Sequence, residues 1–123
     1  KQLVPPTTII LEEAHQFASE SKLEMAIARP IIETIAREGR KFFTSLVLVS
    51  QRPVKLSTTA LSQCNTHIIM KILNPYDLDY IGKSSEGIDR ATLGSITSLG
   101  VGEAVIVGNA VNHPFRVLLK CLQ

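Results

Sequence analysis

The sequence lacks the features of a membrane-bound or a disulfide-stabilised secreted protein. Its apolar runs are all shorter than the roughly 20 residues that a membrane span needs, so we expect no membrane anchor. The first residues contain no long apolar core of a secretory signal. The two cysteines, Cys64 and Cys121, lie far apart and form no Cys-x-x-Cys pair. We expect reduced thiols in a cytoplasmic protein, with neither a metal nor a disulfide framework.

An excess of charge of one sign is also lacking. Thirteen Lys and Arg against eleven Asp and Glu leave a net charge of +2, too small to indicate a nucleic-acid partner from bulk charge. A composition that is 45% hydrophobic and 20% charged argues against disorder. The length suits one domain, residues 1–123, without repeats or flexible linkers. Because the chain does not begin with Met and a turn signal directly precedes its first apolar run, we expect a fragment of a longer protein.

Apolar runs and helix signals alternate along the chain, and the alternation predicts the fold class. Strands are expected at residues 7–11, 43–50, 67–73, 103–107 and 115–119. Helices are expected at residues 20–28, 30–38, 56–64, 76–84 and 88–99, with Ser57 or Thr58 available to cap the third. This order predicts an α/β fold in three layers, with a mainly parallel sheet covered by helices. The short connection between the last two strands predicts an antiparallel pair.

Two acids end the first apolar run. Residues 7–11 (TTIIL) are typical of a buried strand, and Glu12 and Glu13 follow directly. Open α/β sheets place their ligand crevices at the carboxyl ends of strands. In a nucleotide-hydrolysing site one such acid holds Mg²⁺, directly or through water, and the next orients or deprotonates the attacking water. The alternative is that both acids cap the following helix, where the dipole favours negative charge.

A polar amide follows the second expected strand. Gln51, within residues 50–53 (SQRP), would face the same crevice as Glu13. A neutral amide at that place can hydrogen-bond a γ-phosphate or a water and report hydrolysis to the rest of the protein. The alternative is a turn residue that stabilises the break before Pro53. The combination of acids after one strand and an amide after the next is less expected by chance than either feature alone.

Three basic residues precede the second expected strand. A guanidinium of Arg37 or Arg40 could reach a phosphate, in its own subunit or in a neighbour, as an arginine finger does. The alternative for Arg37 is an ion pair with Glu33 four residues earlier, worth only tenths of a kcal/mol. For Lys41 we expect plain solvated surface.

Two glycine-containing segments imitate nucleotide-binding motifs and fail on spacing. Residues 82–84 (GKS) copy the end of Gly-x-x-x-x-Gly-Lys-Ser/Thr, but Asp77 stands where the leading glycine is needed, and no strand precedes it. Residues 100–102 (GVG) are too short for a dinucleotide fingerprint and predict a turn.

Metal-hydrolase and nucleophile chemistry find little support. A metal site would draw on Glu12, Glu13, His15 and His67, but these form no His-Glu-x-x-His motif, and a lone His in a strand is usually a packed side chain. Cys64 has no evident setting that would lower its pKa.

The order of the motifs resembles the HerA/FtsK superfamily. Residues 9–15 (IILEEAH) resemble a Walker B strand, and residues 35–41 (IAREGRK) with 46–53 (LVLVSQRP) resemble the next motif block of that superfamily. Three further segments continue in register with the HerA branch, at residues 65–69, 74–77 and 99–104. The match covers nearly the whole chain. It implies a RecA-like P-loop ATPase that forms hexamers and pumps double-stranded DNA, with ATP and Mg²⁺ as cofactors.

The resemblance also implies roles for individual residues. Glu12 would be the Mg²⁺-associated acid and Glu13 the catalytic base, while Gln51 would sense the γ-phosphate and Arg37 or Arg40 would be the finger. The family more often has Asp at the first acid, so the Glu12 carboxylate reaches one methylene further. The phosphate-binding loop, which lies upstream of Walker B in the family, is absent from the sequence. The chain therefore resembles the carboxyl-terminal half of the ATPase domain, and we expect it to be inactive alone.

The same resemblance implies partners and leaves alternatives. Archaeal HerA works with the nuclease NurA in resecting DNA ends, which implies a NurA-type partner and a role in DNA repair. One alternative is an assembly or binding module that kept the fold and lost catalysis. Another is a related motor of the conjugation or secretion type, although residues 74–103 favour HerA by analogy.

Overall fold

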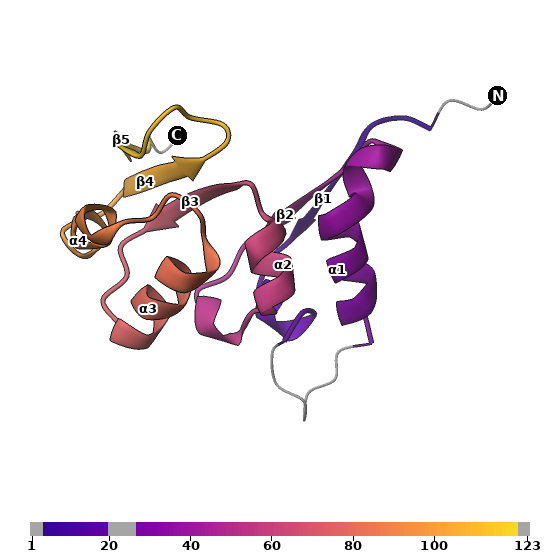
Figure 1. The fold of residues 1–123 in the computed structure, drawn as a ribbon, viewed down its shortest axis with the longest axis horizontal. Helices are drawn as coiled ribbons and strands as arrows, with labels where there is room; N and C mark the ends of the chain where they lie inside the picture. The colour runs from indigo at the N-terminus through magenta and orange to yellow at the C-terminus, as the bar shows by residue number, and fades with distance from the viewer. Residues whose placement is uncertain (1–3, 20–26, 121–123) are drawn as a thin grey trace. The chain divides into compact units, whose positions relative to one another are not determined.

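The computed structural model describes residues 4–19 and 27–120 (Figure 1). The chain divides into two compact units, Lys1–Gln63 and Cys64–Gln123. The helix expected at residues 20–28 falls largely outside the described residues, as does Cys121. None of the helices within the described ranges is long and apolar enough to cross a membrane.

The first unit is built on a parallel pair of strands. Strand β1 (Thr7–Leu11) pairs with β2 (Thr44–Leu48) from Thr7↔Thr44 to Leu11↔Leu48. Helix α1 (Arg29–Glu38) lies between them in the sequence, as a parallel connection requires. Pro30 sits in its first turn, where a missing N–H costs nothing. The predictions for these three elements are confirmed to within two residues at each end.

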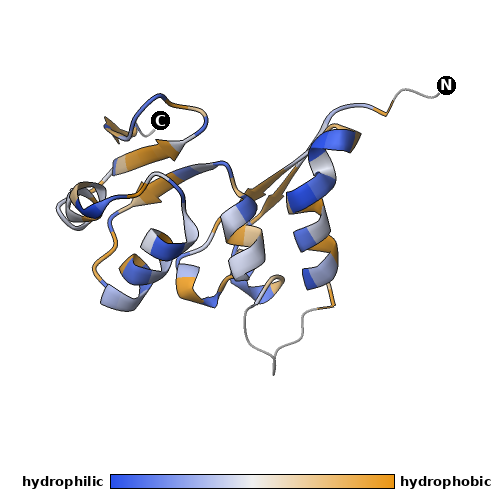
Figure 2. Cartoon of the chain, viewed as in Figure 1, coloured by the Kyte–Doolittle hydropathy of each residue, from blue (hydrophilic) through white to orange (hydrophobic). Residues whose placement is uncertain are grey.

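The two faces of this strand pair differ in their covering. Both strands are apolar over most of their length (Figure 2). On one face Ile9 contributes to a shallow cavity that Ile35 of α1 also lines. On the other face the side chains of Ile10 and Val47 are opposite one another and are 63% and 42% exposed. Within the first unit, one face of the pair is therefore covered and the other is open.

A tight turn carries α1 into β2. The helix ends at Glu38, as predicted, and a short 3-10 helix, η2 (Gly39–Phe42), follows. Gly39 is needed for space and not for its dihedral angle, because a Cβ there would lie 2.6 Å from the Thr44 carbonyl oxygen. Phe43, with φ 55°, takes the left-handed conformation instead.

Three short helices follow the strands of this unit. A 3-10 helix, η1 (Ala14–Gln16), comes after β1, and another, η3 (Pro53–Lys55), comes after β2. Helix α2 (Thr58–Gln63) then ends the unit. Of the two caps considered from the sequence, Ser57 takes the role, because its Oγ accepts the N–H of Ala60 at 3.2 Å.

The second unit is an antiparallel sheet packed on two helices. Strands β3 (Thr66–Met70), β4 (Glu103–Gly108) and β5 (Phe115–Leu118) pair in that order. Helices α3 (Pro75–Ser84) and α4 (Arg90–Thr97) begin at side-chain caps from Asn74 and Asp89. The core of the unit consists of Ile69, Ile81, Ile96, Leu99, Val105 and Val107.

The α/β class is confirmed, and so is the antiparallel pairing of the last two strands. The prediction of a mainly parallel sheet is wrong for the described residues. There β1–β2 is the one parallel pair, and β3 pairs antiparallel with β4. Between β1 and β2 a single helix, α1, carries the chain back to the edge where β1 began, so β2 runs parallel to β1. Two helices, α3 and α4, separate β3 from β4, and the additional reversal lets β4 run in the opposite direction.

Candidate active site

The carboxyl ends of β1 and β2 bring the predicted acids and amide to one edge. Leu11 is level with Leu48, so the residues after each strand begin at the same height. The Val49 N–H donates to the Leu11 carbonyl at 2.9 Å, and the Ala14 N–H donates to the Val49 carbonyl at 3.0 Å. These bonds continue the pairing beyond both strands. The segments that carry Glu12–Glu13 and Ser50–Gln51 therefore lie side by side.

Glu13 occupies a strained backbone position. Its φ and ψ are 50° and 44°, a left-handed conformation that costs a non-glycine residue on the order of 1 kcal/mol and recurs at functional sites. The turn buries Ala14 while the Glu13 side chain stays 47% exposed. Glu13 precedes η1, yet its side chain makes no capping hydrogen bond there. The capping alternative therefore does not account for this residue.

A histidine joins the two segments, and sequence analysis missed that role. His15 Nδ1 lies 3.0 Å from Ser50 Oγ, and its Nε2 lies 3.5 Å from Glu13 Oε2. Ser50 Oγ also accepts the N–H of Arg52 at 3.1 Å. The sequence places His15 and Ser50 35 residues apart, so only the strand pairing reveals the contact. The sequence feature that could have predicted the contact is that His15 and Ser50 each follow one of two neighbouring strands.

The amide of Gln51 is exposed and unengaged. Its side chain makes no hydrogen bond to any residue that the structure describes. The turn before Pro53 is instead held by the Ser50 hydroxyl through the Arg52 N–H. Gln51 is thus not needed as the side chain that fixes the turn.

Arg37 and Arg40 are not brought to the acids within this chain. Arg37 lies in the last turn of α1 and Arg40 lies in η2, shortly before β2, so both are at the amino-terminal edge of the strand pair. The five-residue strands separate the two edges by about 16 Å. Both arginines are exposed, as is Lys41. A phosphate beside Glu13 is therefore out of reach of their guanidinium groups in the same subunit.

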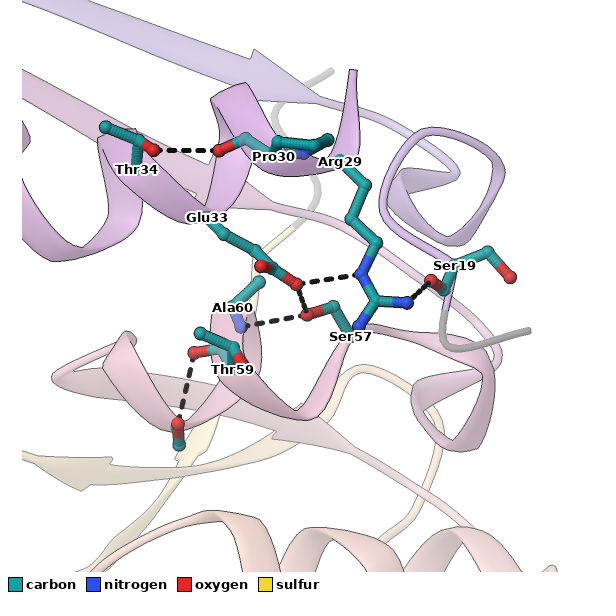
Figure 3. A network of polar contacts seen from close by, with 9 residues as sticks. Ser19, Arg29, Pro30, Glu33, Thr34, Ser57, Thr59 and Ala60 are labelled. Atoms are coloured by element: carbon teal, nitrogen blue, oxygen red, sulfur yellow. Dashed lines mark hydrogen bonds and ion pairs between the residues drawn. The ribbon is translucent and has the colours of Figure 1, made fainter. Parts of the chain in front are cut away.

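Glu33 pairs with a different arginine from the one weighed in the sequence. Its Oε1 accepts the Nε–H of Arg29 at 2.8 Å and also accepts the hydroxyl of Ser57 (Figure 3). Arg29 Nη1 donates to the Ser19 carbonyl at 2.7 Å. These bonds hold the pKa of Glu33 below its usual value, the Ser57 bond having the largest effect, while the charge of Arg37 contributes at longer range.

The Arg29–Glu33–Ser57 network connects the segment that follows Glu13 to the segment that follows Gln51. The Ser57 N–H donates to the Ala18 carbonyl at 2.7 Å, and Ser19 forms a bridge with Leu56. The chain after Glu13 is therefore bound to the chain after Gln51 at its far end as well as at His15. Both segments are positioned by α1 and α2.

The remaining titratable candidates do not form a second site. Burial raises the pKa of the Cys64 thiol, which disfavours the reactive thiolate. Burial also lowers the pKa of His67 in β3. Among the described residues no group of three or more His, Cys, Asp or Glu side chains could hold a metal.

Sequence comparison gives the chain close relatives. No protein-family model matches it. The DNA double-strand break repair helicase HerA of Pyrococcus furiosus is 49% identical over 115 residues, which are 94% of this chain and 20% of that protein. HerA of Saccharolobus solfataricus is 42% identical over 118 residues, 96% of this chain and 23% of that protein. Over nearly its whole length, the chain is similar to a part of these HerA helicases. It spans about a fifth of the length of these HerA relatives.

Structure comparison supports the α/β fold of the chain. A genome packaging NTPase from Sulfolobus turreted icosahedral virus 2, in complex with ATP-gammaS, superposes with a TM-score of 0.75 at 19% sequence identity. The match covers 94% of this chain and 53% of the viral chain. The chain therefore shares its fold with about half of this packaging NTPase.

Proposed function

We propose that this chain carries the hydrolysis edge of an ATPase that moves along double-stranded DNA. The observation that carries the proposal is the parallel pairing of β1 and β2, which puts Glu13 and Gln51 beyond the carboxyl ends of neighbouring strands. The HerA relatives over nearly the whole chain support it. Because the chain spans about a fifth of those relatives, the activity belongs to the full-length protein.

Glu12 is the proposed acid for Mg²⁺, acting through a water. Its exposed carboxylate is a hard oxygen donor of the kind that Mg²⁺ prefers. The described residues offer no protein cage for a metal. This fits an ion that takes one or two carboxylates and completes its shell with water and nucleotide phosphates. Bound there with ATP, the ion would neutralise charge that develops on the phosphates.

Glu13 and Gln51 are proposed to act on the attacking water and on the γ-phosphate. The Glu13 carboxylate is about half exposed, so water can approach it, and it projects from the edge where β1 ends. In the proposed role it accepts a proton from that water. The unengaged Gln51 amide is available to donate to a phosphate oxygen and accept from the water. Losing the phosphate would remove this contact from the turn that carries Gln51.

Arg37 or Arg40 is proposed to act on the nucleotide of a neighbouring subunit. Both lie at the edge of the strand pair opposite Glu13, about 16 Å away, so an action within one subunit is disfavoured. A ring of subunits can place the amino-terminal edge of one beside the hydrolysis edge of the next. The proposed assembly is a homo-hexamer, with double-stranded DNA as cargo and a NurA-type nuclease as partner.

The open face of the first unit supports a larger domain. Parallel strands are normally buried on both faces, yet Ile10 and Val47 are 63% and 42% exposed here. The proposed cover is the other half of the ATPase domain, which would also supply the phosphate-binding loop. Residues 1–123 would then be the carboxyl-terminal half of one domain.

Mixing of inactive variants of the full-length protein tests this function. Glu13→Gln and the double variant Arg37→Ala/Arg40→Ala should each lose nearly all ATP turnover, because each removes one partner from every site. Hexamers assembled from both variants should regain part of the activity, since some interfaces then join an intact Glu13 to an intact arginine pair. Lys41→Ala is the matched control and should leave turnover unchanged.

Two results would redirect the proposal. If wild type and Glu13→Gln are equally inert, the protein is an assembly module of the same fold. If turnover needs Glu13 but responds to no double-stranded DNA, a motor of the conjugation or secretion type becomes the better description. Failure of mixing alone would remove only the action across subunits.

A further inference from the structure

We propose that His15 is a positioning residue that ties the Glu13 carboxylate to the turn carrying Gln51. The inference rests on the proposed function, because it assigns His15 a task within the same site. It starts from the three contacts at the edge of the strand pair: His15 with Ser50, His15 with Glu13, and Ser50 with the Arg52 backbone. Together they form one continuous path from the acid to the turn.

The hydrogens along this path can be arranged without conflict. Ser50 Oγ accepts the N–H of Arg52, which leaves its own hydroxyl hydrogen free to point at His15 Nδ1. A neutral imidazole with Nδ1 as acceptor carries its proton on Nε2. In that tautomer the Nε2–H is the group next to Glu13 Oε2, at an N–O distance of 3.5 Å. The path thus restrains the Glu13 carboxylate through the imidazole ring.

The burial along the path shows which partner restrains the other. The His15 side chain is 14% exposed, whereas that of Glu13 is 47% exposed. Ala14, between them, is fully buried and bonded to Val49, so the backbone that carries His15 is fixed. The fixed imidazole therefore orients the freer carboxylate. Without it, Glu13 would sample several rotamers around its strained backbone.

The same contacts connect the acid to the proposed phosphate sensor. Ser50 directly precedes Gln51, and its hydroxyl holds the turn through the Arg52 N–H. A shift of this turn would reach the Glu13 carboxylate through one imidazole ring. His15 therefore places Glu13 and sets its position relative to Gln51, and it does not itself touch the reacting atoms.

Two substitutions separate the two contacts of the ring. In His15→Asn the amide can occupy the place of Nδ1, which keeps the Ser50 contact and removes the Glu13 contact. In His15→Gln the longer amide can reach the place of Nε2, which keeps the Glu13 contact and removes the Ser50 contact. The measurements are kcat and KM for ATP, and the Kd of a non-hydrolysable analogue, on the full-length protein. His113→Asn, at an exposed histidine of the second unit, is the matched control.

The expected result is a loss of kcat at nearly constant binding. A carboxylate displaced by about 1 Å costs on the order of 10²-fold in rate, so His15→Asn should lower kcat by about 10- to 100-fold. His15→Gln should retain more activity than His15→Asn, and the analogue Kd should change less than about two-fold in both. His113→Asn should match wild type. Normal kcat in His15→Asn beside an inactive Glu13→Gln would overturn the positioning role and leave the proposed function intact.

A structural measurement keeps the inference testable without turnover. A high-resolution structure of full-length wild type should show the Glu13 carboxylate directed at His15 Nε2, and His15→Asn should show it rotated or spread over several conformers. The same Glu13 rotamer in both proteins would overturn the inference. If the wild type has no ATPase activity, the proposed function fails, and this comparison still decides whether His15 positions the carboxylate.

Discussion

At the residue scale, the charges of the first unit act through a few specific partners. The Glu33 carboxylate accepts from Ser57 and Arg29, and these bonds favour its ionised form. Arg29 in turn donates a hydrogen bond to the Ser19 carbonyl, so this side chain joins α1 to the chain that follows η1. The Glu33 side chain is 17% exposed, which shields this pair more than a surface salt bridge. Glu33 therefore connects the local electrostatics to the shape of the candidate site.

The lowered pKa of Glu33 predicts a pH-dependent contribution to stability. A carboxylate whose pKa is lower in the folded than in the unfolded state stabilises the fold at pH values above its ordinary pKa of 4.5. That stabilisation is lost as the pH falls through the folded-state pKa. The Tm of the full-length protein should therefore exceed that of Glu33→Gln at pH 7, and the difference should shrink as the pH falls below 4.5. A difference that stays constant down to pH 3 would contradict this account.

At the element scale, close backbone approaches fix how strands end and turn. In the second unit β3 begins where β4 ends, with Thr66 opposite Gly108. Gly108 has φ +114°, and a Cβ there would lie 2.1 Å from the Asn65 carbonyl oxygen. Both the dihedral angle and the contact therefore require glycine.

The glycine at the end of β4 gives a second prediction. Gly108→Ala should destabilise the second unit by about 2 to 4 kcal/mol, because the methyl group meets backbone atoms and the dihedral angle is strained. Gly94→Ala is the control, since a Cβ at that helical position meets nothing within 4 Å. It should be neutral or stabilise by up to about 1 kcal/mol. Hydrogen exchange of the β3–β4 amides in the full-length protein measures the stability change in each variant. Equal protection in Gly108→Ala and Gly94→Ala would contradict the prediction.

At the scale of the whole molecule, the chain carries the proposed hydrolysis edge, and its sequence contains no phosphate-binding loop. The sequence contains no Gly-x-x-x-x-Gly-Lys-Ser/Thr, whose backbone amides and lysine provide most phosphate contacts in P-loop ATPases. The chain also matches about half of a packaging ATPase and about a fifth of its HerA relatives. In the proposed function, the acids and the amide form one side of the ATP site, and the full-length protein supplies the phosphate-binding side.

The proposed function predicts the behaviour of the 123 residues on their own. They should bind Mg-ATP weakly and should not turn it over, because the nucleotide lacks the contacts of the loop. Calorimetric titration and a phosphate-release assay measure the two quantities. Turnover above background that disappears in Glu13→Gln would show that the chain holds a complete site.

The sequence predicted most elements of the fold, because their signals are local. The Pro30 start of α1, a cap of α2 at Ser57 or Thr58, and the strand pair at the carboxyl end were all evident from short patterns. The antiparallel pairing of β3 was not, since it depends on how two consecutive helices turn the chain. The positions of Glu12, Glu13 and Gln51 at one edge followed from strand order alone.

The contacts within the candidate site could not be predicted in the same way. The His15–Ser50 bond joins residues 35 positions apart, and the Ser57–Glu33 bond joins residues 24 apart. Arg29 and Arg37 both lie four residues from Glu33, and only packing decides that Arg29 is the partner. Pairings of this kind depend on tertiary structure, which the local pattern does not contain.

The most direct test of the central claim is ATP turnover by the full-length protein, with and without double-stranded DNA, beside Glu13→Gln. We expect DNA to stimulate the wild type and Glu13→Gln to be inactive in both conditions while still binding ATP. That result would assign Glu13 to the chemistry of a DNA-dependent ATPase. Equal turnover in wild type and Glu13→Gln would contradict the account, whatever the effect of DNA.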